Sequence, residues 1–551
     1  MNTDPTGPAS GGKSFTAVIL VAVAFITLMA PAFWMSWNTP FSLVDDLHDG
    51  TILDWMRKTG QFGQWVRSTF VTTGDTGRYR PLFELGNFVT WAAAGPHAGW
   101  HHLLRWLEWA VGLFFWNKAL LQLIKMRHYR LRLQLSEYSV LLPLLVFNTF
   151  VCFSPNQPMA RLAPQELHSF VFLGMLCYGV MRWIANPTVP GTDTSRWPYL
   201  LAIGAGYLGL SLSKETNISL MAFFAVFLFL QALHQRSRGA LLAFLSATAL
   251  LVYTLWRIKM ATGASSYGQG SITLTLIGQN LRWLGDSAFQ FATLPVVTLL
   301  LMAVIAGLGL RYIRDRRHWG ASPGQLALFF SLGSTAALIA ILLVSWQPIP
   351  RYYYPLVPLL GWVLAQGVIE MDRRPAGTTL RRGIRVTVMA LALWFITANY
   401  FNYLMQFAAQ YHARQVESRM LDAVRTRLLD GRQVAIVINP NDTAYEMCAS
   451  TQLYFGHYLP AYRNEHWTLK GMNEPRPEPG LELISPHDTP PGWVPAEVIA
   501  GPDSYPALDG VCRVSAMAQG RRYPHLVLDA GVHDFSYRWT FYRPAGGTGT
   551  P

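Results

Sequence analysis

The stretch Thr216-Asn-Ile-Ser-Leu-Met-Ala-Phe-Phe-Ala-Val-Phe-Leu-Phe-Leu-Gln-Ala-Leu233 contains no charged side chain. A helix needs about 20 mainly apolar residues to cross a bilayer core of about 30 Å, so this stretch predicts a transmembrane helix. The whole chain of 551 residues is 51% hydrophobic and only 14% charged, which excludes an assembly of ordinary soluble domains. About eleven runs of this kind predict a mainly α, polytopic membrane protein. They lie at 15–36, 101–123, 137–153, 166–184, 197–213, 216–233, 239–257, 287–310, 324–345, 352–370 and 386–405.

The positive charges indicate how the chain is oriented in the membrane. The net charge is +13, but the basic residues lie in short connectors between apolar runs, so lipid explains them better than nucleic acid does. Every second connector carries a basic cluster, beginning with Lys125, Arg127, Arg130 and Arg132 and ending with Arg381, Arg382 and Arg385. Because such clusters stay in the cytoplasm, the N-terminus is predicted to be cytoplasmic and the C-terminal tail to lie outside the cytoplasmic (inner) membrane.

Three parts of the chain are expected. Residues 1–14 form a glycine-containing, disordered cytoplasmic N-terminus, and residues 15–405 form the membrane domain. Its loop 37–100 has apolar residues at helical spacing and is predicted to form surface helices. Residues 406–551 are predicted to form a small mixed α/β domain outside the membrane. The predicted helices lie at His48–Thr59, Gly63–Thr72 and Pro81–Ala94, and the predicted strands at Val434–Ile438 and Leu526–Leu528.

The four cysteines do not have the spacing of a metal site. Cys448 and Cys512 both fall in the exported tail, where an oxidising compartment would permit a disulfide between them. Two free thiols remain an equal alternative, because a sequence does not determine cysteine pairing.

Two adjacent carboxylates follow the first span, in Phe41-Ser-Leu-Val-Asp-Asp-Leu-His-Asp49. Charged groups at a membrane boundary are costly unless they are solvated, paired or functional. Asp45 or Asp46 could act as a general base toward a hydroxyl group, or hold a divalent cation such as Mg²⁺ or Mn²⁺. The alternative is a solvated loop with an aspartate that caps a helix.

The stretch Gly77-Arg-Tyr-Arg-Pro-Leu82 places two arginines before a proline suited to a helix start. Arginine binds phosphate in a bidentate manner, and a helix start adds backbone donors, so Arg78 and Arg80 are candidate phosphate ligands. Lipid headgroups are an equally suitable partner for both side chains.

Two further connectors on the same predicted side carry charge. Glu166 and His168 lie at the start of the fourth span, where the alternative to a functional role is a helix cap. Lys214 and Glu215 lie in a very short turn, and considered alone they are expected to pair with each other.

A late connector, Gln347-Pro-Ile-Pro-Arg-Tyr-Tyr-Tyr-Pro355, places Arg351 and Tyr352 at the start of the tenth span. Tyrosine at this depth is usually an interface anchor, whereas the arginine is harder to explain in that way.

The predicted topology brings all of these acids and cations to one side of the membrane. Such a set suits transfer of a group from a lipid-linked phosphate, in which an aspartate activates the acceptor and cations stabilise the leaving phosphate.

The order of these motifs resembles the C-type glycosyltransferase superfamily, polytopic enzymes that take sugars from polyprenyl-phosphate carriers. Asp45-Asp46 is similar to its first acidic motif, and Pro164-Gln-Glu166 to its second. Ser213-Lys-Glu215 and Arg351-Tyr-Tyr353 resemble motifs of its protein O-mannosyltransferase-like members. The likeness covers about residues 15–405. The stretch Arg78-Tyr-Arg-Pro-Leu82 through Leu103 also resembles a pattern of the superfamily.

This resemblance implies an enzyme that moves a sugar from a polyprenyl-phosphate donor to an acceptor glycan, lipid or protein of the cell envelope. Asp45 would be the base, with Asp46 as its neighbour, and Glu166 would assist the acceptor or a cation. The donor phosphate would face Arg78, Arg80, Lys214 and Arg351. A transporter or flippase of lipid-linked glycans is the main alternative, although no inverted repeat is visible. A non-catalytic membrane scaffold is the third possible function.

Overall fold

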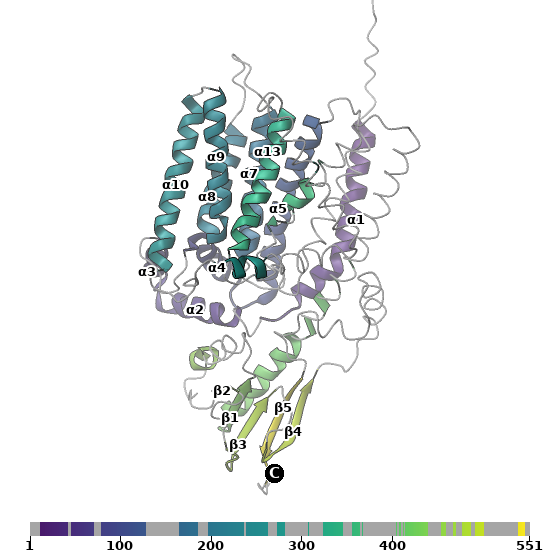
Figure 1. The fold of residues 1–551 in the computed structure, drawn as a ribbon. Helices are drawn as coiled ribbons and strands as arrows, with labels where there is room; N and C mark the ends of the chain where they lie inside the picture. Colours follow the sequence, from purple (N-terminus) through teal and green to yellow (C-terminus); the bar gives the residue numbers. More distant parts are fainter. Residues whose placement is uncertain are drawn as a thin grey trace, which may run out of the picture.

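The chain is a helical bundle followed by a mixed sheet (Figure 1). The bundle contains α1 (Gly11–Trp37), α5 (Ala98–Arg127), α7 (Gln165–Ala185), α8 (Trp197–Ser213), α9 (Ile218–Gln235), α10 (Arg238–Thr262) and α13 (Pro323–Leu343). The computed structural model describes residues 11–41, 46–70, 79–127, 165–185, 197–235, 238–262, 273–280, 323–344, 414–438, 453–458, 467–469, 476–485, 491–500 and 538–545. It also describes 307, 355, 356, 358–363, 366, 400, 404, 407, 408, 411 and 412.

The helices have the length and surface of a multi-pass membrane protein. Within the described residues, four are long and apolar enough to cross a membrane: Glu166–Ala185, Glu215–Leu233, Gly239–Met260 and Pro323–Leu343. α10 exposes large apolar side chains, among them Leu242 at 64% and Val252 at 58%. A surface of this kind is rare on a soluble monomer and is suited to lipid.

Helices are confirmed at seven of the predicted spans. The predicted span at 137–153 lies wholly outside the described residues, and those at 287–310, 352–370 and 386–405 lie mostly outside them. The predicted total of about eleven spans therefore stays a prediction.

Three helices of the loop between α1 and α5 lie at one end of the bundle (Figure 1). They are α2 (Asp46–Thr59), α3 (Phe62–Phe70) and α4 (Pro81–Ala94), and they confirm the helices predicted there. α4 begins at Pro81 and ends before Gly95, whose positive φ of 58° suits glycine. Its residues Phe83 and Trp91 are buried, because the helix packs on α5 and α8.

Glycines allow α7 and α8 to approach each other closely. A Cβ atom added at Gly206 would lie 2.6 Å from the backbone nitrogen of Leu176 and 2.7 Å from the carbonyl oxygen of Phe172. Small residues at such contacts are typical of helix pairs in membranes, where close backbone packing replaces the hydrophobic effect.

Replacing Gly206 with alanine is therefore expected to destabilise the protein by about 1–3 kcal/mol, the usual cost of overpacking. Unfolding in mixed detergent micelles measures the effect. Gly204→Ala is the matched control, because an added Cβ at Gly204 of the same helix meets nothing within 4 Å. Equal stability of the two variants would show that the α7–α8 contact is looser than described.

The C-terminal part contains a five-stranded sheet in the order β2-β1-β3-β5-β4. β1 is parallel to β2 and β3, and β5 is antiparallel to β3 and β4. Val416, Met420 and Val424 of the helix at 414–429 pack against it. The strands are β1 (Gln433–Ile438), β2 (Trp467–Leu469), β3 (Leu481–Ser485), β4 (Trp493–Ala500) and β5 (Arg538–Pro544).

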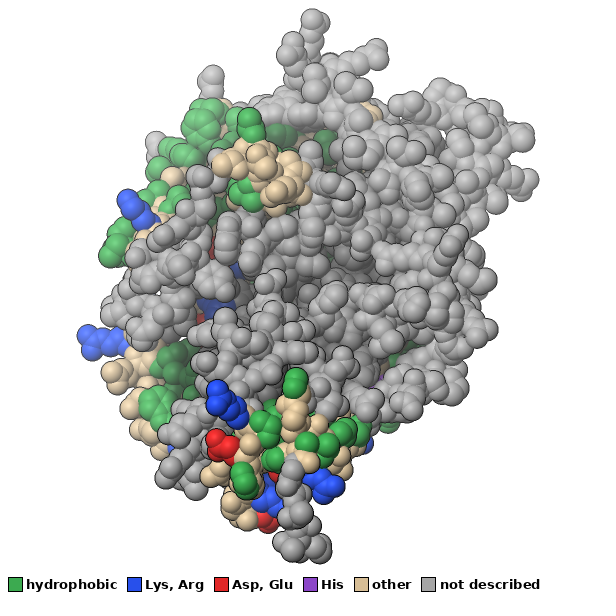
Figure 2. All heavy atoms as spheres, turned by 60° about the horizontal axis from the view of Figure 1, so that its bottom comes forward, with side chains coloured by type: hydrophobic (Ala, Val, Ile, Leu, Met, Phe, Trp, Pro, Cys, Tyr) green, Lys and Arg blue, Asp and Glu red, His purple; other side chains and the backbone are tan. Residues whose placement is uncertain are grey.

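The described part of the tail contains this sheet, whereas the mixed α/β domain predicted for residues 406–551 stays a prediction. The strand predicted at Val434–Ile438 is confirmed within β1. The strand predicted at Leu526–Leu528 and both tail cysteines, Cys448 and Cys512, lie outside the described residues. Figure 2 shows charged side chains gathered over the described part of the C-terminal end.

Candidate functional site

Five of the predicted site residues have described side chains: Arg80, Glu166, His168, Lys214 and Glu215. Asp46 is the first residue of α2, but its side chain is outside the described set. The remaining predicted residues, Asp45, Arg78, Arg351 and Tyr352, lie outside the described residues altogether.

Lys214 and Glu166 form a buried ion pair between the end of α8 and the first turn of α7. Their side chains are only 5% and 4% exposed. Asn217 fixes the turn over α7, because its Nδ2 donates to Ser169 Oγ at 2.9 Å. The backbone of Lys214 is extended, with φ −162° and ψ 143°, immediately before the short 3-10 helix η1 (Glu215–Asn217).

The expectation that Lys214 pairs with Glu215 is therefore wrong. The turn is held against α7, so that Lys214 contacts the carboxylate of Glu166, a residue 48 positions earlier. Glu215 itself is half-buried, and its Oε1 atom is buried without a hydrogen-bond partner among the described residues. This oxygen is consequently able to accept a hydrogen bond from a ligand.

Arg80 lies at the start of α4 beside Glu84, with 2.9 Å between Nε and Oε1. Its guanidinium carbon is 4.6 Å from the ring centroid of Phe83, and the Phe83 ring in turn contacts His168. The Arg80 side chain is 17% exposed, so part of it is accessible from outside the protein.

His168 belongs to a buried network that joins α4, α5 and α7. Its Nδ1 atom is 2.8 Å from Oε1 of Glu108, whose Oε2 accepts a 2.8 Å hydrogen bond from Arg105. Arg105 also donates to Asn87 of α4 at 3.3 Å. These contacts give His168 a role in holding the helices together, and sequence reasoning missed Arg105 and Glu108.

Sequence reasoning also missed Arg257 near the end of α10. This arginine is only 4% exposed, and its guanidinium carbon lies 5.1 Å from the ring centroid of Tyr79. Tyr79 stands between Arg78 and Arg80 in the sequence, and burial raises its pKa above the ordinary value. A charged residue within a predicted membrane helix is a functional candidate by default, so this signal was present in the sequence.

These residues come from elements that meet at one end of the bundle, the end on which α4 packs (Figure 1). Cations from three different elements, Arg80, Lys214 and Arg257, lie there among carboxylates. Such an arrangement is suited to holding a phosphate group and stabilising its charge. Among the described residues, no group of three or more His, Cys, Asp and Glu side chains could hold a metal ion.

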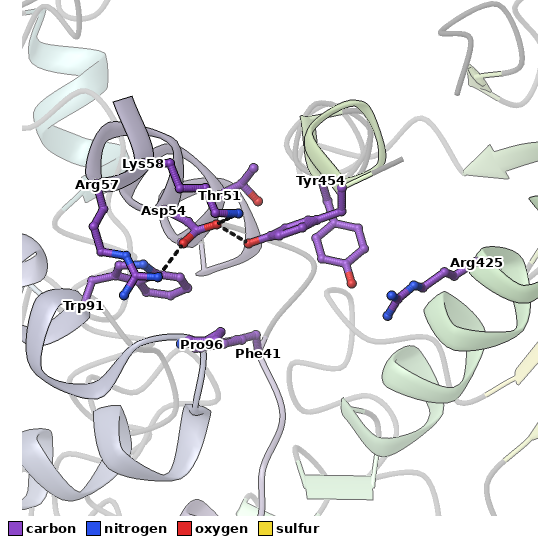
Figure 3. A pocket seen from close by; sticks show the side chains of 11 residues that line it. Phe41, Thr51, Asp54, Arg57, Lys58, Trp91, Pro96, Arg425 and Tyr454 are labelled. Carbon is purple, nitrogen blue, oxygen red and sulfur yellow. Dashed lines mark hydrogen bonds and ion pairs between the residues drawn. The ribbon is translucent and has the colours of Figure 1, made fainter. Parts of the chain in front are cut away.

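Asp54 of α2 connects this end of the bundle to the C-terminal part, as Figure 3 shows. Its Oδ2 atom lies 2.7 Å from Lys58 Nζ, 3.2 Å from His457 Nε2 and 3.1 Å from the Tyr458 hydroxyl. Burial alone would raise the pKa of Asp54. The hydrogen bonds from Lys58, His457 and Tyr458 outweigh that effect, and the pKa is lowered below its ordinary value.

The contact between α2 and residues 453–458 is therefore expected to weaken in acid. Because the folded pKa of Asp54 is below the unfolded value of about 3.9, the stabilisation is complete above pH 3.9 and is lost as pH falls through the folded pKa. Hydrogen exchange of 453–458, corrected for intrinsic rates, should rise over that interval in the wild type. Asp54→Asn should exchange fast already at neutral pH, and the exposed control Asp430→Asn should follow the wild type. Identical profiles for all three proteins would contradict this role of Asp54.

No protein-family model matches the chain, and no curated protein matches it. Two solved structures are similar to it, both of ArnT from Cupriavidus metallidurans. The structure bound to undecaprenyl phosphate is 14% identical, with a TM-score of 0.38 over 80% of this chain and 75% of that one. The apo structure is 11% identical, with a TM-score of 0.39 over 81% and 76%. At these values the likeness concerns the fold alone.

Proposed function

We propose that this chain transfers a sugar from a polyprenyl-phosphate donor to an acceptor of the cell envelope. The buried pair of Lys214 and Glu166 is the observation that carries the proposal. A buried ion pair stabilises a protein little compared with apolar residues of similar size, and ionisable groups among membrane helices usually serve a function. Glu215 adds a buried carboxylate oxygen that has no hydrogen-bond partner among the described residues.

The cations would bind the donor phosphate and stabilise the charge that develops on it as the bond to the sugar breaks. Lys214 is supported by its burial, and both Lys214 and Arg80 are supported by their position at one end of the bundle. Arg78 and Arg351 are assigned the same task from the sequence, and Arg257 joins them from the structure.

Asp45 or Asp46 is proposed as the general base that removes the proton of the acceptor hydroxyl group. Glu166 orients Lys214, and Glu215 accepts a hydrogen bond from donor or acceptor. His168 orients α7 through Glu108, and Tyr352 accompanies Arg351 at the donor. If a divalent cation, Mg²⁺ or Mn²⁺, takes part in the reaction, the two aspartates would hold it.

The reaction is proposed to take place at the outer face of the cytoplasmic membrane. Residues 15–405 would form the catalytic membrane domain and residues 406–551 a domain outside it, with Cys448 and Cys512 as its candidate disulfide. The basic clusters of alternate connectors support this orientation.

Reconstitution in proteoliposomes distinguishes transfer from transport. A transferase should convert a radiolabelled polyprenyl-phosphate sugar into free polyprenyl phosphate and a labelled acceptor extract. A flippase would move the intact donor to the other leaflet without cleaving it, and that result would overturn the proposal in favour of transport.

A further inference from the structure

A cavity of about 480 Å³ lies between α2, the end of α4 and the C-terminal part (Figure 3). Its volume is within the range of about 300–1,000 Å³ that is typical of small-molecule sites. Segments more than 300 residues apart in the chain line it, since α2 contributes Asp54 and Lys58 and the helix at 414–429 contributes Arg425. None of the eleven lining residues that the structure describes is Leu, Ile, Val or Met.

The charge of the lining favours an anionic ligand. Arg57, Lys58 and Arg425 are cationic, whereas Asp54 is the one carboxylate among the described residues of the lining. The Asp54 charge is already matched by Lys58 at 2.7 Å and by hydrogen bonds from His457 and Tyr458. Arg425 has no ion-pair or hydrogen-bond partner among the described residues. It is therefore able to bind a carboxylate or phosphate in a bidentate manner.

The aromatic lining favours a ligand with a flat apolar face in addition to charge. Trp91, Phe41 and Tyr454 line the same cavity. Trp91 is only 4% exposed, and its Nε1–H group is buried without an acceptor among the described residues. Gly50 leaves room for the indole, because a Cβ there would lie 2.7 Å from the Trp91 ring. A sugar ring offers an apolar face of C–H groups, which matches the aromatic rings, and hydroxyl groups, which match the charged side chains of the lining.

We infer that this cavity binds an anionic saccharide of one or two rings that carries a carboxylate or phosphate group. Arg425 binds the anionic group, and the aromatic rings hold the sugar. If the chain transfers sugar as proposed, this saccharide is the acceptor. Only its identification as the acceptor rests on the proposed function; its binding to the cavity does not.

Binding to the purified full-length chain in nanodiscs of neutral lipid tests the inference. The probes are digalacturonic acid and N-acetylglucosamine 1-phosphate, compared by calorimetry with neutral diacetylchitobiose and with inorganic phosphate. Arg425→Glu should weaken binding of both charged saccharides about tenfold or more, the effect of losing one charge-assisted hydrogen bond. Arg419→Glu is the matched control, because Arg419 is exposed on the same helix and does not line the cavity.

Three results would overturn the inference: no binding of either charged saccharide to the wild type, equal losses in the two variants, or competition by inorganic phosphate as strong as by the sugar phosphate. The assay contains no polyprenyl donor, so its outcome is independent of sugar transfer. If the wild type transfers sugar but Arg425→Glu transfers it equally well at low acceptor concentration, the acceptor binds elsewhere while the proposed function stands.

Discussion

Replacing Lys214 with methionine is expected to lower the free energy of unfolding by about 3–5 kcal/mol, because Glu166 then remains buried without its cation. Reversible unfolding in mixed detergent micelles measures this change. Arg67→Met, at an exposed arginine of α3 outside the predicted spans, is the control and should leave stability unchanged. A loss below about 1 kcal/mol for Lys214→Met would show that water reaches the pair, since exposed ion pairs contribute no more than that.

The double variant Lys214→Met/Glu166→Gln separates a structural role from a functional one. The second change removes the buried carboxylate that Lys214→Met leaves without this cation, so most of the lost stability should return. If Lys214 binds the donor phosphate, sugar transfer by this stable protein stays low. Recovery of both stability and transfer would mean that the pair serves only to hold α7 against η1.

Replacing the catalytic aspartate, Asp45 or Asp46, with asparagine is expected to slow sugar transfer by about 10²- to 10⁴-fold, the usual effect of removing a general base. The change conserves size and hydrogen bonding, so the fold should be retained. Asp49→Asn is the matched control, because Asp49 lies in the same stretch and outside the pair of adjacent carboxylates. Initial rates at saturating donor measure the effect, alongside unfolding of each variant.

Normal rates in both Asp45→Asn and Asp46→Asn would contradict the assignment of the base. Glu215 would then be the next carboxylate to test, since its Oε1 atom is buried without a hydrogen-bond partner among the described residues.

The helices were predictable because their signals are local. An apolar run long enough to span a bilayer, such as 216–233, needs no knowledge of its neighbours to be recognised as a helix. The same holds for α4, where Pro81 marks the start and Gly95 the end. Orientation of these helices and the number of spans remain predictions, because they depend on residues outside the described set and on the membrane.

The partners of the site residues were not predictable, because they depend on how the helices pack. Lys214 is adjacent in sequence to Glu215, yet Asn217 holds the turn so that Lys214 meets Glu166. Contacts between residues far apart in the sequence were not predictable for the same reason. The hydrogen bond between Asp54 and Tyr458 is an example. Arg257 was within reach of sequence reasoning, since it lies inside a predicted span.

The most direct test of the proposed function measures the free polyprenyl phosphate that the purified wild-type chain forms. The donors are a panel of labelled polyprenyl-phosphate sugars, and envelope extract is the acceptor. The proposal predicts that one donor yields polyprenyl phosphate and labelled acceptor in equal amounts, and that Asp45→Asn or Asp46→Asn abolishes both products together. Absence of cleavage of every donor by a folded wild-type protein would contradict it.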